Sequence, residues 1–472
     1  MAENRNLILL SVFIGVLMSA VDTTIVLLAL PTLTVNLKAP FINTIWVILI
    51  YLLFLAALTT QMGRLGDIFG RGRIFNLGFL VFIVGSAASG AAPNINFLIV
   101  SRAVQGFGAV LLQANSSAIV ADYFPPNERG KAFGITSMGW NVGGTLGIVL
   151  GGLITTLIGW RFIFYINIPI GLIGFVLALR YIRDNKTTAV KIDYIGTSIL
   201  IILLSFLSYG VVDIAGHGVS TFNMILITLG LLLFIPFIIT EMRVKDPVIE
   251  LKAFKERILT FSLFAAFLQA VGYLSVIFML TMYLQGIRGF SPLYASLLLV
   301  PGYVLASILA PFMGRLSDKI GAGIVATVGI FFMAAGLSVY FLLNLTSSTY
   351  LVISGSIIAG FGGSMFWPSN NSAVMSGAPR KIYGSVSGLL RTLTNMGTLL
   401  SYVITVTVAT TTVPRTVAFE VFLGIGKLTG KVSTKFLAGI HYALLVSLIL
   451  LIFAGIFSFV RTRTHRKVEN NW

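Results

Sequence analysis

"GRLGDIFGRGR", residues 63–73, places four charges and four glycines in eleven positions of a chain that is only 10% charged. Long apolar runs flank this stretch, at 42–62 and at 74–92. A run of about 18 to 25 apolar residues matches a hydrocarbon slab of ~30 Å at a rise of ~1.5 Å per residue. The stretch therefore predicts a tight charged turn between two membrane-spanning helices.

The composition of the whole chain points the same way. The 472 residues are 57% hydrophobic, with a mean hydropathy of +0.97, and a soluble protein could not cover so much apolar surface. The first run begins at Leu7, is long enough to span and ends without a small-residue cleavage site, so we expect it to be a span and not a signal peptide. The absence of cysteine excludes disulfides, thiol catalysis and cysteine metal ligands. We predict an all-α integral membrane protein.

Apolar runs of spanning length recur along the chain and predict 14 transmembrane helices. They lie at 7–30, 42–62, 74–92, 97–121, 132–155, 161–183, 193–213, 221–241, 258–283, 292–313, 322–344, 350–372, 384–409 and 438–460. An even number of spans places both termini on one side of the membrane.

The distribution of Lys and Arg decides which side that is. One set of connections holds 23 of the 32 Lys and Arg residues, and the opposite set holds seven. Because basic loops stay in the cytoplasm, we expect a multi-pass protein of the cell (plasma) membrane with both termini cytoplasmic. The net charge of +17 follows from this loop bias. It indicates some affinity for anionic membrane lipid and no nucleic acid as a partner.

The charged turn has a second copy, "GRLSDKIGAG" at 314–323, in which Gly, Arg, Leu, Asp and two further Gly recur at the same spacing. Each copy lies between the second and third spans of a six-span block. The repeat predicts two pseudo-symmetric six-helix bundles, at 1–183 and 257–472, with two additional helices at 184–256 between them. Two similar halves around a central path are the usual architecture of a secondary transporter.

Four stretches together resemble a known family. "GRLGDIFGRGR" resembles the cytoplasmic signature of the major facilitator superfamily. "DTTIVLLALP" (22–31), "RAVQGFGA" (102–109) and "WRFIFYINIPIG" (160–171) resemble motifs of its fourteen-span drug:proton antiporters. The likeness is dense in the N-terminal half and sparse in the C-terminal half. It implies a monomeric, cofactor-free transporter that exports hydrophobic or amphipathic small molecules such as drugs in exchange for protons, by alternating access.

Two alternatives stay open. One is a uniporter or uptake symporter of a small organic solute, and the other is a membrane-embedded enzyme. An enzyme needs a nucleophile with a base, or a metal constellation, inside the slab. The three histidines His217, His441 and His465 have no acidic partners at metal-ligand spacing. We therefore expect no enzyme activity, no catalytic residues and no metal site.

Asp22 is the carboxylate of most interest because it lies ~22 Å along a helix entered at Leu7, well inside the slab. A charge at that depth costs roughly 2.5–3.5 kcal/mol on insertion scales unless it is paired, hydrated or protonated. Such a group suits proton loading and release. The alternative interpretation is a static polar anchor in the first helix.

Arg102 is the expected partner of Asp22. The fourth span runs in the opposite direction, and by helical rise the two residues differ in depth by only ~6 Å. In the resembled family the matching Arg is tied to proton coupling, and with Gln105 and Gly106 it forms the fourth-span motif. The alternative is that Arg102 pins helices together through hydrogen bonds with Gln105.

The fifth span carries "GWNVGGTLGIVLGG" (139–152), with a glycine at every fourth position. Such a stripe lets another helix approach closely. By resemblance it is the antiporter motif of exporters, although Ile148 stands where the family usually has Pro. The packing residues of this motif are Gly139, Gly143, Gly147, Gly151 and the adjoining Gly152.

By resemblance, the charged turn at 63–73 is a gating latch between the two halves that holds the outward-open state. The residues themselves suggest how it works, since glycines allow a tight turn and a carboxylate can accept from N–H groups at a helix N-terminus. We expect the arginines, including Arg73, to pair with Asp67, Asp122 or Glu128. The gating residues are Gly63, Arg64, Asp67, Gly70 and Arg71.

The substrate path is less determined. Between Glu256 and Glu420 the only acid is Asp318, so the C-terminal half of the path lacks carboxylates, and we expect amphipathic, neutral or monocationic substrates. Each aromatic candidate can equally be helix packing. The segment 410–437 resembles an external hairpin without an assigned role. The candidate path residues are Gln113, Asn115, Trp140, Asn141, Gln269, Tyr273, Phe366, Trp367, Asn370 and Asn371.

Overall fold

A computed structural model describes residues 2–39, 41–184, 193–245, 247–249, 251–379, 382–409, 411–413 and 430–469. Over these ranges the chain is helical and contains no strand. Most of the expected hairpin at 410–437 lies outside the described residues. The first half comprises α1 (Ala2–Asn36), α2 (Phe41–Phe69), α3 (Arg71–Gly90), α4 (Ile95–Tyr123), α5 (Pro126–Leu157), α6 (Phe162–Tyr165) and α7 (Asn167–Tyr181).

The helices after α7 fall into two groups. Between the halves lie α8 (Tyr194–His217), α9 (Thr221–Leu232) and α10 (Phe234–Arg243). The second half comprises α11 (Arg257–Tyr273), α12 (Val276–Met282), α13 (Pro292–Ile320), α14 (Ala322–Val339), α15 (Thr349–Ser376), α16 (Tyr383–Ala409) and α18 (Lys431–Glu469). Short turns at Leu251–Lys255, Tyr283–Ile287 and Tyr340–Leu342 complete the described helical structure.

Twelve helical segments in the described part of the chain are long and apolar enough to cross a membrane, with α6 and α7 counted as one segment and likewise α9 and α10. Two of the fourteen expected runs are not among them. The run at 258–283 corresponds to α11, which is apolar but 17 residues long, followed by α12 after a break at Leu274 and Ser275. The run at 384–409 corresponds to α16, which has 27 residues and is therefore long enough, but which is not among the twelve apolar segments.

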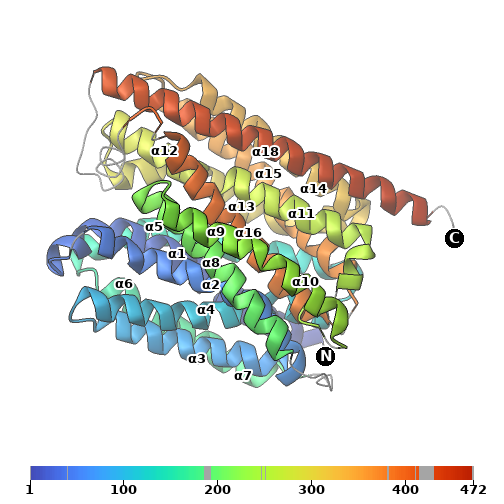
Figure 1. Ribbon diagram of the computed structural model, residues 1–472. Helices are drawn as coiled ribbons and strands as arrows, with labels where there is room; N and C mark the ends of the chain where they lie inside the picture. The colour runs from blue at the N-terminus through green and yellow to red at the C-terminus, as the bar shows by residue number, and fades with distance from the viewer. Residues whose placement is uncertain are drawn as a thin grey trace.

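The two halves lie side by side, and α8–α10 cross the front of the bundle between them (Figure 1). The extensive contacts between the halves are α2 with α16 and α5 with α13, and α8 packs on both α2 and α16. Within the first half, α1 packs along α5 and α3 along α4. The first helix begins, and the last one ends, at the same end of the bundle (Figure 1).

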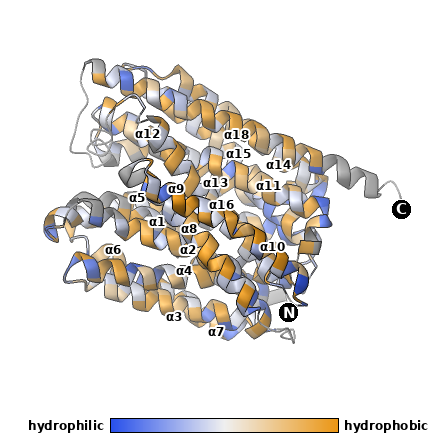
Figure 2. Ribbon diagram, in the orientation of Figure 1, coloured by the Kyte–Doolittle hydropathy of each residue, from blue (hydrophilic) through white to orange (hydrophobic). Residues whose placement is uncertain are grey.

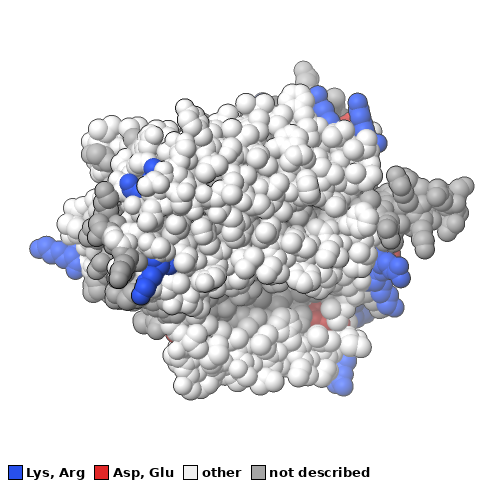
Figure 3. All heavy atoms as spheres, turned by 90° about the horizontal axis from the view of Figure 1, so that it is seen from above, with Lys and Arg blue, Asp and Glu red and all other residues white. Residues whose placement is uncertain are grey.

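Polar residues gather at the two ends of the bundle, and hydrophobic residues fill its length (Figure 2). The face in Figure 3 shows Lys and Arg only toward the two ends, with an uncharged belt between them. Large apolar side chains are exposed along the helices, among them Phe331 of α14 at 69% and Leu179 of α7 at 64%. A soluble protein rarely exposes so broad an apolar surface, whereas lipid tails cover it.

Candidate functional site

A buried ion pair joins α1 to α4. Arg102 Nη1 lies 2.5 Å from Asp22 Oδ2, and the two side chains are 1% and 0% exposed. Arg102 Nε also donates to the carbonyl oxygen of Val47 at 2.9 Å, and its guanidinium carbon lies 4.4 Å from the ring centroid of Tyr51. The structure thus brings together the two residues expected to pair and closes them off from solvent.

Neutral side chains complete the network around Asp22. The Gln105 side chain accepts from Arg102 Nη1 and donates to Asp22 Oδ1, both at 2.8 Å. The Ser86 hydroxyl accepts from Gln105 at 2.9 Å and from Asn167 at 3.2 Å, and Asn167 also donates to Asp22 at 3.4 Å. Since leaving one member of a buried pair alone is strongly unfavourable, separating Arg102 from Asp22 would carry a large cost in free energy.

Ser86 and Asn167 were not predicted from the sequence. Asn167 lies inside the motif at 160–171, so that stretch carried a signal for it. Ser86 is one of several small residues in α3, and no motif in the sequence indicated a role for it. Both are completely buried.

The glycine stripe of the fifth span packs α5 against α1. A Cβ added at Gly143, Gly147 or Gly151 would lie 2.6–2.7 Å from a carbonyl oxygen of α1, closer than Cβ atoms come. A Cβ added at Gly139 would lie 2.9 Å from the Phe13 side chain of α1. Gly152 is one residue beyond Gly151 and so lies ~100° around the helix from it. The absence of side chains therefore lets the two backbones touch next to Asp22.

Asp67, in the last turn of α2, binds the first turn of α16. Its carboxylate accepts from the N–H groups of Gly384 and Ser385, both at 2.8 Å, and from the Ser385 hydroxyl at 2.9 Å. Arg71 bridges Asp67 at 2.7 Å and Asp122 at 2.5 Å. A carboxylate is favourable at a helix N-terminus. We call these five residues the first clasp.

The degraded second copy of the motif makes the reciprocal contact. Asp318, near the end of α13, accepts from the backbone N–H of Gly130 at 2.9 Å and of Lys131 at 3.1 Å, in the second turn of α5. We call these three residues the second clasp. Each half therefore holds the start of one helix of the other half, at the end of the bundle where α1 begins.

Gly63 lies inside α2 and not in the turn where it was predicted. A Cβ at Gly63 would lie 3.0 Å from the carbonyl carbon of Gly384 and 3.1 Å from the Cα of Gly388, so this glycine lets α2 and α16 touch. Gly314 and Gly130 bring α13 and α5 together in the same way. The tight turn itself belongs to one residue, Gly70, whose φ is 106°.

The pairing expected for two charges near the first clasp was wrong. Arg73 pairs with Asp184, with 3.2 Å between Nε and Oδ2, and Glu128 lies 3.5 Å from Arg5. Sequence spacing could not reveal Asp184, because it follows α7, which the fold places beside α3.

Two further motif residues lie outside the ion pair and the clasps. Gly106 packs α4 on α2, since a Cβ there would lie 3.1 Å from the Cα of Tyr51. Arg64 lines a separate small cavity with Asp193 and Val248.

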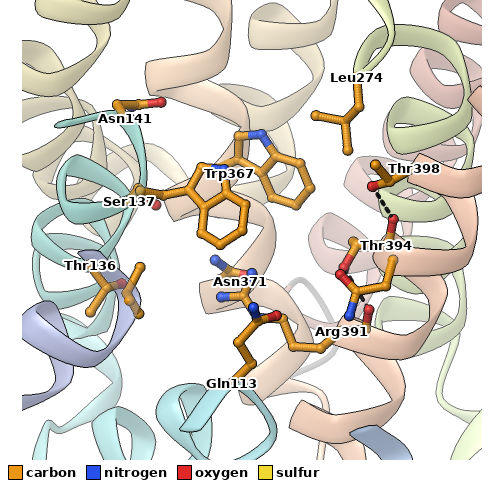
Figure 4. A pocket seen from close by; sticks show the side chains of 13 residues that line it. Gln113, Thr136, Ser137, Asn141, Leu274, Trp367, Asn371, Arg391, Thr394 and Thr398 are labelled. Atoms are coloured by element: carbon orange, nitrogen blue, oxygen red, sulfur yellow. Dashed lines mark hydrogen bonds between the residues drawn. The ribbon is translucent and has the colours of Figure 1, made fainter. Parts of the chain in front are cut away.

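A cavity of about 70 Å³ lies between the two halves. Small-molecule sites typically enclose ~300–1,000 Å³, so a substrate requires the walls to move apart. Five of the candidate path residues line it: Gln113, Trp140, Asn141, Trp367 and Asn371. The complete wall consists of Val16, Gln113, Thr136, Ser137, Trp140, Asn141, Leu274, Trp367, Asn371, Arg391, Thr394, Asn395 and Thr398 (Figure 4).

The other candidate path residues lie elsewhere, because a polar side chain on a span can serve a helix contact as well as a cavity. Asn115 donates to the Leu111 carbonyl of its own helix at 3.1 Å. The Asn370 amide oxygen accepts from Arg461 Nη1 at 2.7 Å. The remaining three pack within the second half: Gln269, Tyr273 and Phe366.

Arg391 was not among the candidates, yet it is the charged residue of the cavity wall. Within the described chain, no carboxylate oxygen lies within 4.0 Å of its side-chain nitrogens, and its Nε has no hydrogen-bond partner. The sequence did carry a signal, because Arg391, Thr394, Asn395 and Thr398 follow the helical i, i+3, i+4, i+7 pattern. This pattern places one polar face of α16 on the cavity.

Comparison with known proteins identifies the family. The family model of the Major Facilitator Superfamily matches residues 12–402. The riboflavin transporter RibZ of Clostridioides difficile (strain 630) is 31% identical over 400 residues, 84% of this chain and 86% of that protein. Multidrug resistance protein 3 of Bacillus subtilis (strain 168) is 28% identical over 413 residues, 85% of this chain and 79% of that protein.

A solved structure shares the fold. The crystal structure of a bacterial homologue of the iron transporter ferroportin in an outward-facing state aligns with a TM-score of 0.65 at 14% identity, over 97% of this chain and 99% of that one. Because the family model covers most of the sequence and the relatives are transporters, the chain belongs to the major facilitator superfamily and is a membrane transporter.

Proposed function

We propose that this transporter exports hydrophobic or amphipathic small molecules in exchange for protons, by alternating access across the cell membrane. The observation that carries the proposal is the fully buried pair of Asp22 and Arg102. An ionisable pair inside a span is otherwise difficult to account for, since structural packing needs no charge there.

Helix α5 supplies a physical link between this pair and the cavity. One face of α5 rests on α1 through the glycine stripe, beside Asp22. Another face presents Ser137, Trp140 and Asn141 to the cavity. When a proton neutralises Asp22, its attraction to Arg102 falls, and a shift of α1 carries α5 and the cavity wall with it.

The clasps supply the gate. They close one end of the bundle by tying α2 to α16 and α13 to α5, and we assign this end to the cytoplasm because the basic connections gather there. The state described here is then closed to the cytoplasm, and the inward-open state requires both clasps to separate.

The proposal includes the membrane topology. Adding α11 with α12 and α16 to the twelve apolar helices makes fourteen spans, as in the fourteen-span drug:proton antiporters. The blocks are then 1–183, 184–256 and 257–472, with both termini cytoplasmic. The basic connections, with 23 of the 32 Lys and Arg residues, support this orientation.

A second candidate function is transport of riboflavin or a similar flat heterocycle. Two indole side chains, Trp140 and Trp367, line the cavity, and stacked rings prefer such surfaces. A relative 31% identical to this chain is a riboflavin transporter. Binding of riboflavin that is abolished by Trp367→Ala would favour this candidate.

A proteoliposome assay tests the coupling. Compounds that raise the melting temperature of the purified chain at either of two pH values are added to liposomes that contain the protein and the pH dye pyranine. An antiporter moves protons opposite to the compound. A symporter moves them in the same direction, and a uniporter moves the compound without proton flux, so either result would reject the proposal.

A further inference from the structure

The central cavity contains an uncompensated positive charge. Arg391 is the charged member of the wall. The acids of the ion pair and the first clasp are engaged elsewhere, Asp22 with Arg102 and both Asp67 and Asp122 with Arg71. No carboxylate among the described residues belongs to the cavity wall. The cavity is therefore an electropositive site inside an apolar bundle.

Two neutral groups in the same wall also lack partners. Gln113 Nε2 and Asn371 Oδ1 make no hydrogen bond with any described residue, although both residues are only 3% exposed. Figure 4 shows the side chains of Gln113, Asn371 and Arg391 directed to the same part of the cavity. Because buried polar atoms are normally bonded, three unpartnered groups at one place point to a polar ligand.

Another arginine of this half without a carboxylate neighbour among the described residues differs from Arg391. Arg461 is buried, at 1% exposure, and its guanidinium donates to Ser262 at 2.7 Å, to Asn370 at 2.7 Å and to Ser458 at 3.0 Å. These neutral oxygens hold Arg461 in place. Arg391 has no such set within the described chain.

We propose that the substrates are organic anions, in which a carboxylate, sulfonate or phosphate group binds Arg391 and Gln113 while an apolar or aromatic body lies against Trp140 and Trp367. Guanidinium forms strong, directional hydrogen bonds with such groups. This inference rests on the proposed transport function and names its substrate class. It replaces the expected monocationic substrate, which the charge of Arg391 would repel.

The charge of the substrate bears on the direction of transport. If one monoanion leaves the cell for each proton that enters, both movements carry positive charge inward. An inside-negative membrane potential therefore drives both. The inference also separates the two candidate functions, because riboflavin is uncharged at neutral pH.

The cysteine-free chain allows a test that requires no known substrate. Ser137→Cys places one thiol in the cavity wall with little change of volume. The full-length protein is treated with an anionic thiol reagent, 2-sulfonatoethyl methanethiosulfonate, and with a cationic one, 2-(trimethylammonium)ethyl methanethiosulfonate. Each rate is divided by the rate of the same reagent with 2-mercaptoethanol. Thr346→Cys, exposed in the connection between α14 and α15, is the control outside the cavity.

We expect the anion-to-cation rate ratio at Ser137→Cys to exceed that at Thr346→Cys by about tenfold, within the range of electrostatic focusing in clefts. Adding Arg391→Gln should remove this excess, while Arg391→Lys, which keeps the charge, should retain it. Gel filtration and melting temperature establish that each variant is folded. If the Gln variant misfolds, the wild-type ratio and the Lys variant still decide the matter.

Other outcomes separate this inference from the proposed function. An equal ratio with and without Arg391, or faster reaction of the cationic reagent, overturns the anion site alone. Failure of both reagents at Ser137→Cys while Thr346→Cys reacts removes the aqueous path, and both proposals fall. A normal ratio in a protein that moves no protons in the pyranine assay overturns the coupling and leaves the anion site standing.

Discussion

Arg102, within the fourth span of the N-terminal half, faces a carboxylate, whereas Arg391 and Arg461 of the C-terminal half have no carboxylate within 4.0 Å in the described chain. A pair such as Asp22 and Arg102 is neutral as it stands, so a proton can replace the cation. A lone cation such as Arg391 gains most from an incoming anion. In our proposal, this difference places proton chemistry in the N-terminal half and recognition of the substrate's charge in the C-terminal half.

The largest effect is expected from removing the negative charge of Asp22, in the buried ion pair of the N-terminal half. Asp22→Asn keeps the shape of the side chain but cannot ionise, so proton-driven efflux should fall by about a hundredfold, near the upper end of usual coupling. Substrate exchange without a pH gradient should persist. Both are measured in proteoliposomes with a transported compound, and undiminished gradient-driven efflux would show that Asp22 is a static anchor.

The link between the ion pair and the cavity is broken next, at the contact of α5 with α1. Gly147→Leu forces a side chain between touching backbones, and overpacking typically costs ~1–3 kcal/mol. We expect a lower melting temperature and a proton leak in liposomes.

Gly144 is the matched control on the same helix, because the atom nearest to an added Cβ is 3.9 Å away, on Tyr303. Gly144→Ala and the off-stripe Gly152→Ala should both be mild. If all three variants leak equally, the glycine stripe has no special role in coupling.

The clasps should show a smaller effect, on conformation and not on affinity. Asp67→Ala leaves two N–H groups of α16 without their acceptor, and loss of a helix cap costs ~1 kcal/mol, about a fivefold shift toward the inward-open state. Spin labels at Asn127→Cys and Ser376→Cys, both exposed at the clasp end, report the distance between the halves.

Asp318→Ala is the comparison for the second clasp. It removes two acceptor contacts, whereas Asp67 makes three with α16 and a further ion pair with Arg71. We expect a weaker shift in the same direction. A large loss of substrate binding in Asp67→Ala without a change of distance would make Asp67 a ligand residue.

The smallest effect on the cavity is expected at Arg461. Arg461→Lys keeps the charge and loses the fork of hydrogen bonds, so the protein should lose ~1 kcal/mol of stability. The labelling ratio at Ser137→Cys should change by less than about twofold, as for independent sites. A change as large as that caused by Arg391→Gln would mean that the cavity potential arises from the whole half and not from Arg391.

Much of the fold could be predicted because apolar length alone identifies a span. The charged turn at 63–73 was placed correctly, but its charges lie on helix ends, since α2 continues to Phe69 and α3 begins at Arg71. Hydropathy detects only the part of a helix inside the slab. The helical extension beyond it carries Asp67, and that extension is what lets Asp67 reach α16.

The ion pair could be predicted because depth follows from counting residues along straight helices, and this placed Asp22 near Arg102. Neighbours around the helix could not be predicted in this way. Whether a side chain faces lipid, another helix or the cavity depends on how the helices cross. Asn370 and Asn371 illustrate this, since one binds Arg461 and the other lines the cavity.

The reciprocal clasps also have a consequence for biogenesis. Gly130 of α5 is synthesised 188 residues before the Asp318 that binds it, and Asp67 precedes Ser385 by 318 residues. Contacts so distant in sequence form late, after the intervening chain has been made and inserted. The contacts of Asp67 with α16 and of Asp318 with α5 therefore form only after α16 and α13 have been made.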